Sequence, residues 1–140
     1  MKYWLFITNK NNLENIQKSN VYGFNSGSKR LYNKINVGDK IILYLIPKRI
    51  VGFYKVKEKD LKNKISFNEG VFSSQLQMDT LKILNEPLIL NKELVEMIST
   101  FKNKKHWGVV LMGKSCVELN EEDYLYLFNH KTKNHITTEA

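Results

Sequence analysis

The chain has 140 residues, of which 42% are hydrophobic, and this size suits one compact domain with its own core. Twenty-two Lys and Arg against 14 Asp and Glu give a net charge of +8, which favours a polyanionic partner. The single cysteine, Cys116, excludes a disulfide framework and a multi-thiolate zinc site, and no apolar run approaches the ~20 residues of a membrane span. We therefore expect one cytoplasmic domain that does not bind a membrane.

Apolar runs separated by turn signals predict three strands and one helix in the first half of the chain. The helix would be capped by Asn11 or Asn12 and would end at Ser19, with Leu13 and Ile16 facing the core. Strands are predicted over residues 2–8, 40–46 and 50–56. Because only three residues separate the last two strands, they predict a hairpin.

The second half alternates between charged loops and short elements. We expect a loop over residues 57–70, a strand from 75 to 84 that Glu86-Pro87 ends, a helix over 91–99 and a strand over 107–112. Asn120 should cap a last helix through Phe128, whose first turn carries three carboxylates at the positive end of the dipole. These elements predict an α+β fold, a small curled mixed β-barrel with short flanking helices. Residues 1–130 would form the domain, and 131–140 a flexible tail or the start of a linker.

Two stretches about eighty residues apart place aromatic rings beside Asn or Lys. The first is Tyr3-Trp4-Leu5-Phe6-Ile7-Thr8-Asn9 with Asn20-Val21-Tyr22-Gly23, and the second is Phe101-Lys102-Asn103-Lys104-Lys105-His106-Trp107. A flat ring, an amide and nearby cations are what a protein needs to hold an unstacked nucleobase and neutralise its phosphates. The pattern therefore indicates nucleic-acid binding.

The run from Gly108 to Ser115 matches the G-x-x-x-x-G-K-S pattern of a phosphate-binding loop. That loop must follow an apolar strand and open a long helix, whereas here the preceding residues are Lys-rich and the intervening four favour a strand. We interpret the match as accidental. Lys114 remains a candidate contact to a nucleic-acid backbone.

Catalytic patterns are sparse. His106, His130 and His135 lack metal-ligand spacing among themselves or with Cys116, so we expect no metal and no cofactor. Cys116 with His106 has the residue types of a nucleophile and its base, but ten residues of separation do not show that they meet. A hydrolase that processes RNA or DNA therefore stays open as an alternative to a binding domain.

The landmarks together resemble an EVE domain, and they appear in family order across about residues 2–128. They are Tyr3 to Asn9, Asn20 to Gly23, Val37-Gly38-Asp39 with the apolar run into Tyr44, Ile50-Val51-Gly52, Asn103 to Trp107, Glu118-Leu119, and Glu121 to Tyr124. The EVE family belongs to the PUA-like superfamily with the YTH domains. The resemblance implies a curled β-barrel that binds nucleic acid, with a modified base in an aromatic pocket and no enzymatic activity.

The same resemblance assigns residues to that pocket. Asn9 would read a base edge, Tyr22 takes the place of a cage tryptophan in YTH relatives, and Trp107 would close the other side. Gln75 stands where many archaeal relatives carry an arginine, which removes a cation near the pocket. Thr8 and Phe24 complete the expected base-binding set, whereas Trp4 is expected in the core.

The remaining cations would contact phosphates, which gives salt-dependent affinity but little sequence choice. The expected phosphate-binding residues are Lys29, Arg30, Lys104, Lys105 and Lys114. The partner would be DNA or RNA with a modified or flipped base. A further alternative is the target-recognition module of a modification-dependent restriction NTPase, fused to the domain or associated with it, because EVE-like domains also occur in such systems.

Overall fold

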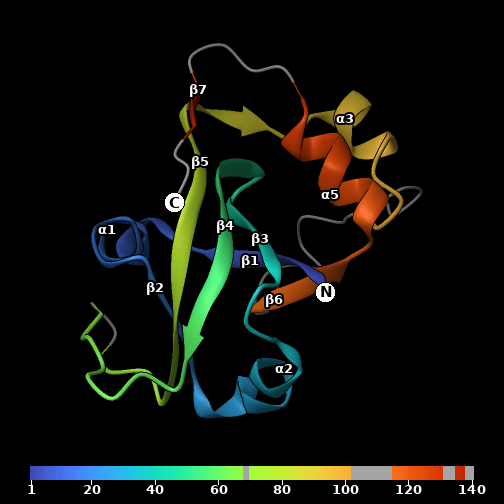
Figure 1. Cartoon of the computed structure of the whole chain (residues 1–140). Coiled ribbons are helices and arrows are strands. Elements are labelled where there is room, and N and C mark those ends of the chain that lie inside the picture. The colour runs from blue at the N-terminus through green and yellow to red at the C-terminus, as the bar shows by residue number, and fades with distance from the viewer. Residues whose placement is uncertain (68–69, 102–114, 131–134, 138–140) are drawn as a thin grey trace.

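The structure is a computed structural model that describes residues 1–67, 70–101, 115–130 and 135–137. Strands and short helices are interspersed along the chain (Figure 1). The elements are β1 (Tyr3–Thr8), α1 (Lys10–Ser19), β2 (Val21–Phe24), the 3-10 turn η1 (Ser26–Ser28), α2 (Lys29–Lys34), β3 (Lys40–Leu45), β4 (Arg49–Lys59), β5 (Ser74–Ile89), α3 (Lys92–Glu96), β6 (Cys116–Leu119), α5 (Glu121–Phe128) and β7 (His135–Thr137).

One curled sheet organises the molecule. Its strand order is β2-β5-β4-β3-β1-β6, and β7, within the stretch expected to be a tail, pairs with β5. β1 and β3 run parallel, and the other neighbours are antiparallel. The expected β3–β4 hairpin is confirmed, as is the α+β class with a curled mixed sheet and short flanking helices.

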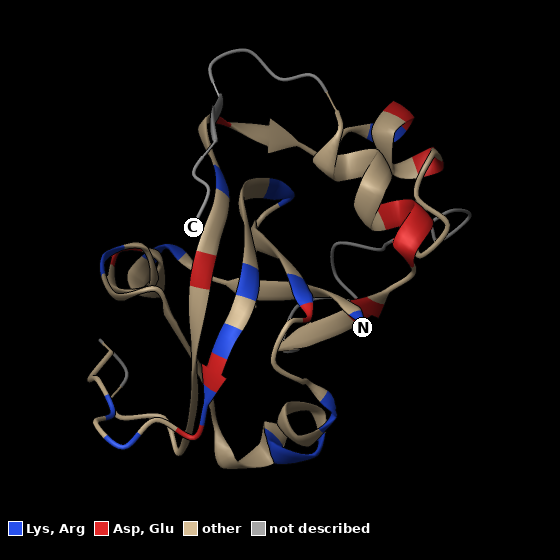
Figure 2. Ribbon diagram, viewed as in Figure 1, with Lys and Arg blue, Asp and Glu red and all other residues tan. Residues whose placement is uncertain are grey.

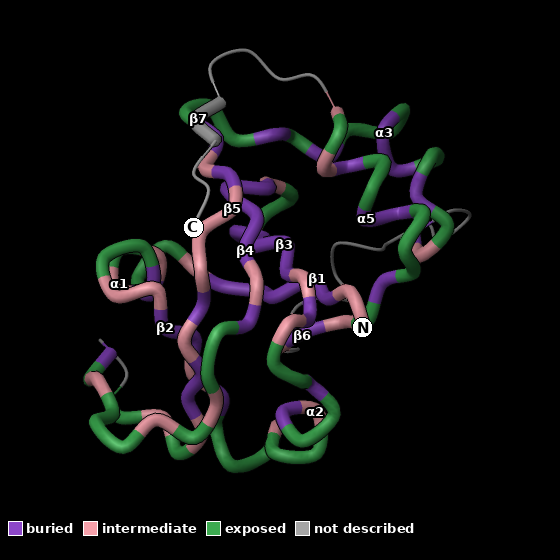
Figure 3. Tube along the Cα trace, in the orientation of Figure 1, coloured by how far each residue is buried: buried purple, intermediate pink, exposed green. Residues whose placement is uncertain are grey.

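The sheet buries both faces because its central strands are apolar at nearly every position. Successive side chains of a strand point to opposite faces, so Trp4 and Phe6 join one core while Leu5 joins the other. α1 covers the first core through Ile16, and α3 and α5 cover the second, so β1 and β3 are buried along most of their length (Figure 3). Trp4 is 1% exposed, as expected of a core residue.

Asp39 fastens the start of β3 to the start of β1. Its buried carboxylate accepts hydrogen bonds from the Trp4 indole Nε1 at 3.0 Å, the Lys2 amide at 3.0 Å and the Asn36 amide at 2.9 Å. Gly38 before it has φ of 95°, a conformation that glycine adopts without strain. Three donors satisfy a charge that would otherwise be costly to bury.

The last helix begins as expected, since the Asn120 side chain accepts a hydrogen bond from the Asp123 amide at 2.7 Å. Asp123, expected only to stabilise the helix dipole, has a second role. Its buried carboxylate accepts bonds from the amides and hydroxyls of Ser99 and Thr100, at 2.7 to 3.0 Å. It therefore fixes α5 to the turn after α3.

Several predicted boundaries were wrong: β4 continues to Lys59, into the expected loop, and α3 ends at Glu96, before the expected Ser99. α1 is capped by Asn9, two or three residues earlier than expected, because the Asn9 side chain accepts a hydrogen bond from the Asn12 backbone N–H. β5 continues past Pro87 to Ile89, since the register with β4 shifts from the Gly52–Ile83 pair to the Ile50–Leu88 pair and leaves the proline in the irregularity. Among the described residues no helix is long and apolar enough to cross a membrane.

Candidate functional site

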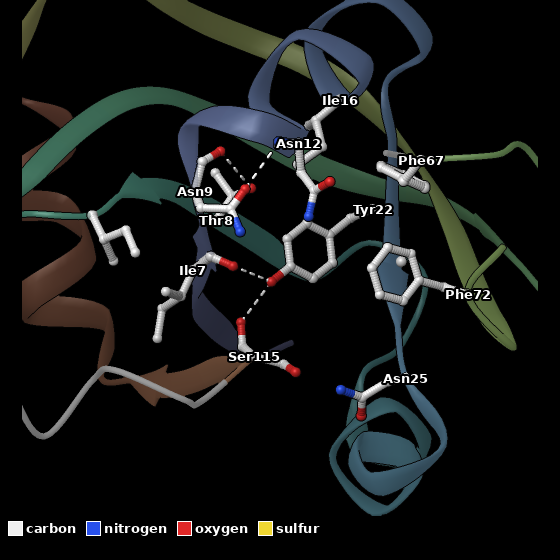
Figure 4. A pocket seen from close by; sticks show the side chains of 12 residues that line it. Ile7, Thr8, Asn9, Asn12, Ile16, Tyr22, Asn25, Phe67, Phe72 and Ser115 are labelled. Carbon is white, nitrogen blue, oxygen red and sulfur yellow. Dashed lines mark hydrogen bonds between the residues drawn. The ribbon is translucent and has the colours of Figure 1, made fainter. Parts of the chain in front are cut away.

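A pocket of about 220 Å³ opens where β1 ends and α1 begins (Figure 4). Four segments surround it, which are residues 7–16, residues 22–25, Ile46, and the pair Phe67 and Phe72, together with Ser115 directly before β6. Its lining residues are Ile7, Thr8, Asn9, Asn12, Ile16, Tyr22, Gly23, Asn25, Ile46, Phe67, Phe72 and Ser115. The pocket therefore combines apolar side chains with three amides and three aromatic rings.

Tyr22 is fixed in place by its hydroxyl group. The residue is 4% exposed, and its hydroxyl lies between the carbonyl oxygens of Ile7 and Ser115, the latter at 2.7 Å. The ring packs against Phe6 with centroids 4.6 Å apart. Burial raises the pKa of Tyr22 well above its ordinary value, so the group stays neutral. Tyr22 thus offers the pocket a rigid, uncharged aromatic surface.

The side-chain amides of Asn9, which caps α1, and of Asn12, in its first turn, have different hydrogen-bonding states. The side-chain oxygen Asn9 Oδ1 accepts a hydrogen bond from the backbone N–H of Asn12 at 2.9 Å. The oxygen expected to read a base therefore already caps the helix. Asn12 is 9% exposed, and its Oδ1 has no hydrogen-bond partner among the described residues. A buried acceptor left in this state costs about 1–3 kcal/mol, which a donor on a bound molecule would offset.

Phe72 forms an aromatic wall that depends on Gly23. A Cβ atom at position 23 would lie 2.4 Å from Phe72 Cδ2 and 2.6 Å from Cγ, so only glycine lets the ring lie this close to β2. Phe67 meets Phe72 edge to face, with centroids 5.1 Å apart. The two rings lie at one side of the pocket, as Figure 4 shows.

Gln75 supports this wall from behind. It is fully buried, and its side-chain amide accepts from the Ile65 amide at 2.9 Å and donates to the carbonyl oxygens of Ile65 at 2.9 Å and Phe72 at 3.3 Å. All three hydrogen bonds connect Gln75 to Ile65 or Phe72, in the loop between β4 and β5. Gln75 therefore positions the wall and does not face the pocket.

The structure brings together three of the predicted base-binding residues, Thr8, Asn9 and Tyr22. Phe24 is 0% exposed in the core beside Tyr22, so it lies behind the pocket like Gln75. Trp107 and the expected phosphate contacts Lys104, Lys105 and Lys114 lie outside the described residues. Lys29 and Arg30 are exposed on α2, where a phosphate could reach them.

Sequence reasoning missed four lining residues with base-binding chemistry: Asn12, Asn25, Phe67 and Phe72. Asn12 was interpreted as a helix cap, although its place three residues after Asn9 puts both amides on one side of α1. Phe72 was not singled out, although it lies three residues before Gln75, the predicted departure from archaeal relatives. Nothing local to Phe67 or Asn25 indicates their position, because tertiary contacts alone place them there.

Cys116 does not have the environment of a nucleophile. The residue is 2% exposed, and burial raises the pKa of its thiol to about 12, so the reactive thiolate is scarce at neutral pH. In the part of the chain that the structure describes, no group of three His, Cys, Asp or Glu side chains could hold a metal ion.

Solved structures with this fold include YTH domains. The crystal structure of the Mmi1 YTH domain complex with RNA has a TM-score of 0.64 at 11% identity, covering 91% of this chain and 75% of that one. The YTH domain of Zygosaccharomyces rouxii MRB1, in complex with N6-methyladenosine RNA, has a TM-score of 0.62 at 14% identity over 90% of this chain and 84% of that one. Agrobacterium tumefaciens protein Atu2648 has a TM-score of 0.56 at 16% identity over 91% and 90%. These likenesses confirm the expected fold.

Sequence relatives agree with the fold. The UPF0310 protein PH1033 of Pyrococcus horikoshii is 31% identical over 137 residues, which cover 89% of this chain and 94% of that protein. The UPF0310 protein PYRAB08750 of Pyrococcus abyssi is 30% identical over 139 residues, with 89% and 95% covered. The family description "EVE domain" matches residues 2–130. The chain therefore belongs to the EVE domain family.

Proposed function

We propose that this EVE domain is a non-catalytic nucleic-acid-binding module that holds one base, in particular a modified base, in the pocket at the end of β1. One observation carries the proposal: a buried amide oxygen, Asn12 Oδ1, has no hydrogen-bond partner in the part of the chain that the structure describes, and it lies in a pocket that also contains the rings of Tyr22 and Phe72. The edge of every nucleobase carries an N–H donor, and every base has a flat face that stacks on an aromatic ring.

The size of the pocket favours a single base over a larger ligand. Its volume of about 220 Å³ lies below the roughly 300–1,000 Å³ of pockets that hold drug-sized molecules. Flipping a base out of a duplex costs a few kcal/mol, whereas stacking on an aromatic side chain returns about 1–3 kcal/mol per base. We therefore expect single strands, or bases that pair weakly, to be preferred over intact duplex.

Apolar side chains in the lining support a preference for a methylated base. Ile7, Ile16 and Ile46 line the pocket beside the aromatic rings. Burying one additional methyl group on them would contribute about 0.8 kcal/mol, or roughly fourfold in affinity. The YTH domain of Zygosaccharomyces rouxii MRB1, which shares the fold, was solved with N6-methyladenosine RNA, and this supports the same ligand class here.

Exposed cations would hold the backbone of the strand. Figure 2 shows Lys and Arg on α2, along β4 and in the loop that follows β4. Lys29 and Arg30 on α2 are exposed, and Lys104, Lys105 and Lys114 remain predicted phosphate contacts. The net charge of +8 suits such a partner.

A binding panel tests the proposal. Modified and unmodified DNA and RNA, single- and double-stranded, would be titrated against the wild type and against Asn12→Leu, Trp107→Ala and Tyr22→Ala. Tyr126→Ala is the control, because Tyr126 is an exposed ring on α5. Tyr22 is a core residue, so the Asn12 variant keeps the test valid if Tyr22→Ala does not fold.

We expect the control to bind like the wild type and the pocket variants to lose affinity mainly for the preferred base. The oligonucleotide should be recovered intact. Equal affinity of every protein for every ligand would overturn the pocket and leave only a basic surface.

A further inference from the structure

A second pocket lies beside the end of α1. It has a volume of about 350 Å³ and is lined mainly by Ser19, Val21, Glu58, Leu61, Lys62 and Gln77. It shares no lining residue with the pocket of Tyr22. One side belongs to the sheet, and the other to the loop that follows β4, drawn beside β2 and α1 in Figure 1.

The sheet sets three of these side chains side by side. Val21 of β2 pairs with Gln77 of β5, and Gln77 pairs with Glu58 of β4. Side chains of directly opposite residues point to the same face of a sheet. Tyr22 follows Val21 and points the other way, so the second pocket and the pocket of Tyr22 open on different faces.

The polar groups of this pocket are available to a ligand. Glu58 and Lys62 are exposed and Gln77 is half-buried, and among the described residues their carboxylate, ammonium and amide groups have no hydrogen-bond or ion-pair partner. Ser19 differs, because its hydroxyl donates to the Asn15 carbonyl at 2.6 Å and accepts from the Val21 amide at 3.1 Å. The pocket thus offers a carboxylate with two acceptor oxygens, beside donors from an amide and a cation.

We propose that this pocket binds a guanine base, with the Glu58 carboxylate accepting from guanine N1–H and N2–H while Gln77 or Lys62 donates to O6. The apolar side chains of Val21 and Leu61 would contact the base. The guanine could belong to a free nucleotide or to a nucleic-acid strand, because both present the same edge. The site is independent of the base pocket at β1, and neither proposal needs the other.

The carboxylate is what selects guanine over the other bases. Guanine alone presents two adjacent N–H donors on its Watson–Crick edge, which match the two oxygens of a carboxylate. Adenine and cytosine place an acceptor nitrogen next to their amino group, and uracil flanks its single N–H with two carbonyl oxygens. In each of these bases an acceptor atom would face a Glu58 oxygen, and the two lone pairs would repel each other.

Titrations with GMP, IMP and AMP test this assignment, since IMP differs from GMP only by the missing N2 amino group. We expect GMP to bind about tenfold more tightly than IMP, with AMP weaker still. Glu58→Gln should abolish the preference for GMP. Glu86→Gln, the same change at an exposed position of β5, should preserve it. Equal affinity for the three nucleotides, or an unchanged preference in Glu58→Gln, would overturn the proposal.

Two further measurements locate the site and identify the source of the base. With GMP, the amide resonances of Gln77 and Leu61 should shift while those of Asn9 and Asn12 stay in place, and the reverse pattern would contradict the site. Oligouridine strands that carry a single guanosine or a single inosine form the second arm. If the protein distinguishes GMP from IMP but does not distinguish the two strands, the natural ligand is a free nucleotide. If it distinguishes the guanosine strand from the inosine strand more strongly than GMP from IMP, the ligand is a nucleic acid. Asn12→Leu should leave guanine discrimination unchanged, so failure of one site is distinguishable from failure of the other.

Discussion

Replacing Asn12 with leucine should increase stability and weaken binding at the same time. Asn12 Oδ1 is buried in the base pocket without a partner among the described residues, and such an acceptor costs about 1–3 kcal/mol. Leucine has a similar branched shape and no polar atom. We therefore expect the free energy of unfolding of Asn12→Leu to rise by about 1–3 kcal/mol, or roughly 3 °C in Tm per kcal/mol.

Helix propensity must be separated from this effect, because leucine favours a helix over asparagine by up to about 0.5 kcal/mol. Asn15→Leu on the same helix is the control, since Asn15 is half-buried and does not line the pocket. The stability gain of Asn12→Leu beyond that of Asn15→Leu measures the unpartnered oxygen. Urea unfolding monitored by circular dichroism gives both values.

The binding half of the prediction uses the same two variants. A neutral hydrogen bond contributes about 0.5–1.5 kcal/mol, so Asn12→Leu should weaken binding of the preferred oligonucleotide by roughly 2- to 12-fold. Asn15→Leu should bind like the wild type. A less stable Asn12→Leu protein would show that the oxygen has a partner in the free protein, and unchanged binding would show that it does not contact the ligand. Either result would refute the reasoning.

Three further variants or conditions test the supports of the site and the fold. Gly23→Ala should lower the free energy of unfolding by about 1–3 kcal/mol and weaken base binding, because the new Cβ would displace the Phe72 ring. The double variant Gly23→Ala/Phe72→Ala should recover part of this stability. Urea unfolding that shows no loss for Gly23→Ala would contradict the prediction. Asp39→Ala leaves three hydrogen-bond donors without their acceptor and should lower the free energy of unfolding by at least about 3 kcal/mol, measured by the same urea unfolding. A loss below about 1 kcal/mol would contradict this, because it would show that water replaces the carboxylate easily. Burial raises the pKa of Tyr54 to about 12 and that of Tyr22 further, so the folded state keeps protons that the unfolded state releases above about pH 10. Stability should therefore fall as pH rises from about 10, and titration of these rings near pH 10 in a protein still folded by circular dichroism would contradict their burial.

Local sequence signals predicted β1, α1, β3, β4, β5, α3 and α5, because each depends on neighbours in the chain, but they did not predict β2, α2, β6 or β7. The apolar runs around Pro47 gave the β3–β4 hairpin, and Asn120 gave the start of α5. The extension of β5 past Pro87 could not be predicted, since it depends on how the register with β4 shifts. The second role of Asp123 was hidden for the same reason, because its partners Ser99 and Thr100 lie more than twenty residues away.

Residues of the site could be predicted only where local sequence spacing or the family resemblance indicates them. Tyr22 and Asn9 follow from the resemblance, and both line the pocket. Asn12 could have been found from its spacing to Asn9, but whether its oxygen has a partner depends on the surrounding packing. Gln75 was expected to face the ligand and instead holds the segment of Phe72, a contact that no local pattern indicates.

The central claim is that one base, held in the pocket of Tyr22 and Asn12, accounts for most of the specific affinity. An abasic scan tests it most directly: each nucleotide of a short bound single strand without guanine is replaced in turn by an abasic site, and the dissociation constant is measured by fluorescence anisotropy. We predict that one position weakens binding by about tenfold or more while the others change it little, and that Asn12→Leu flattens the profile. Equal small losses at every position, or none, would show that the protein tracks only the backbone and would contradict the account.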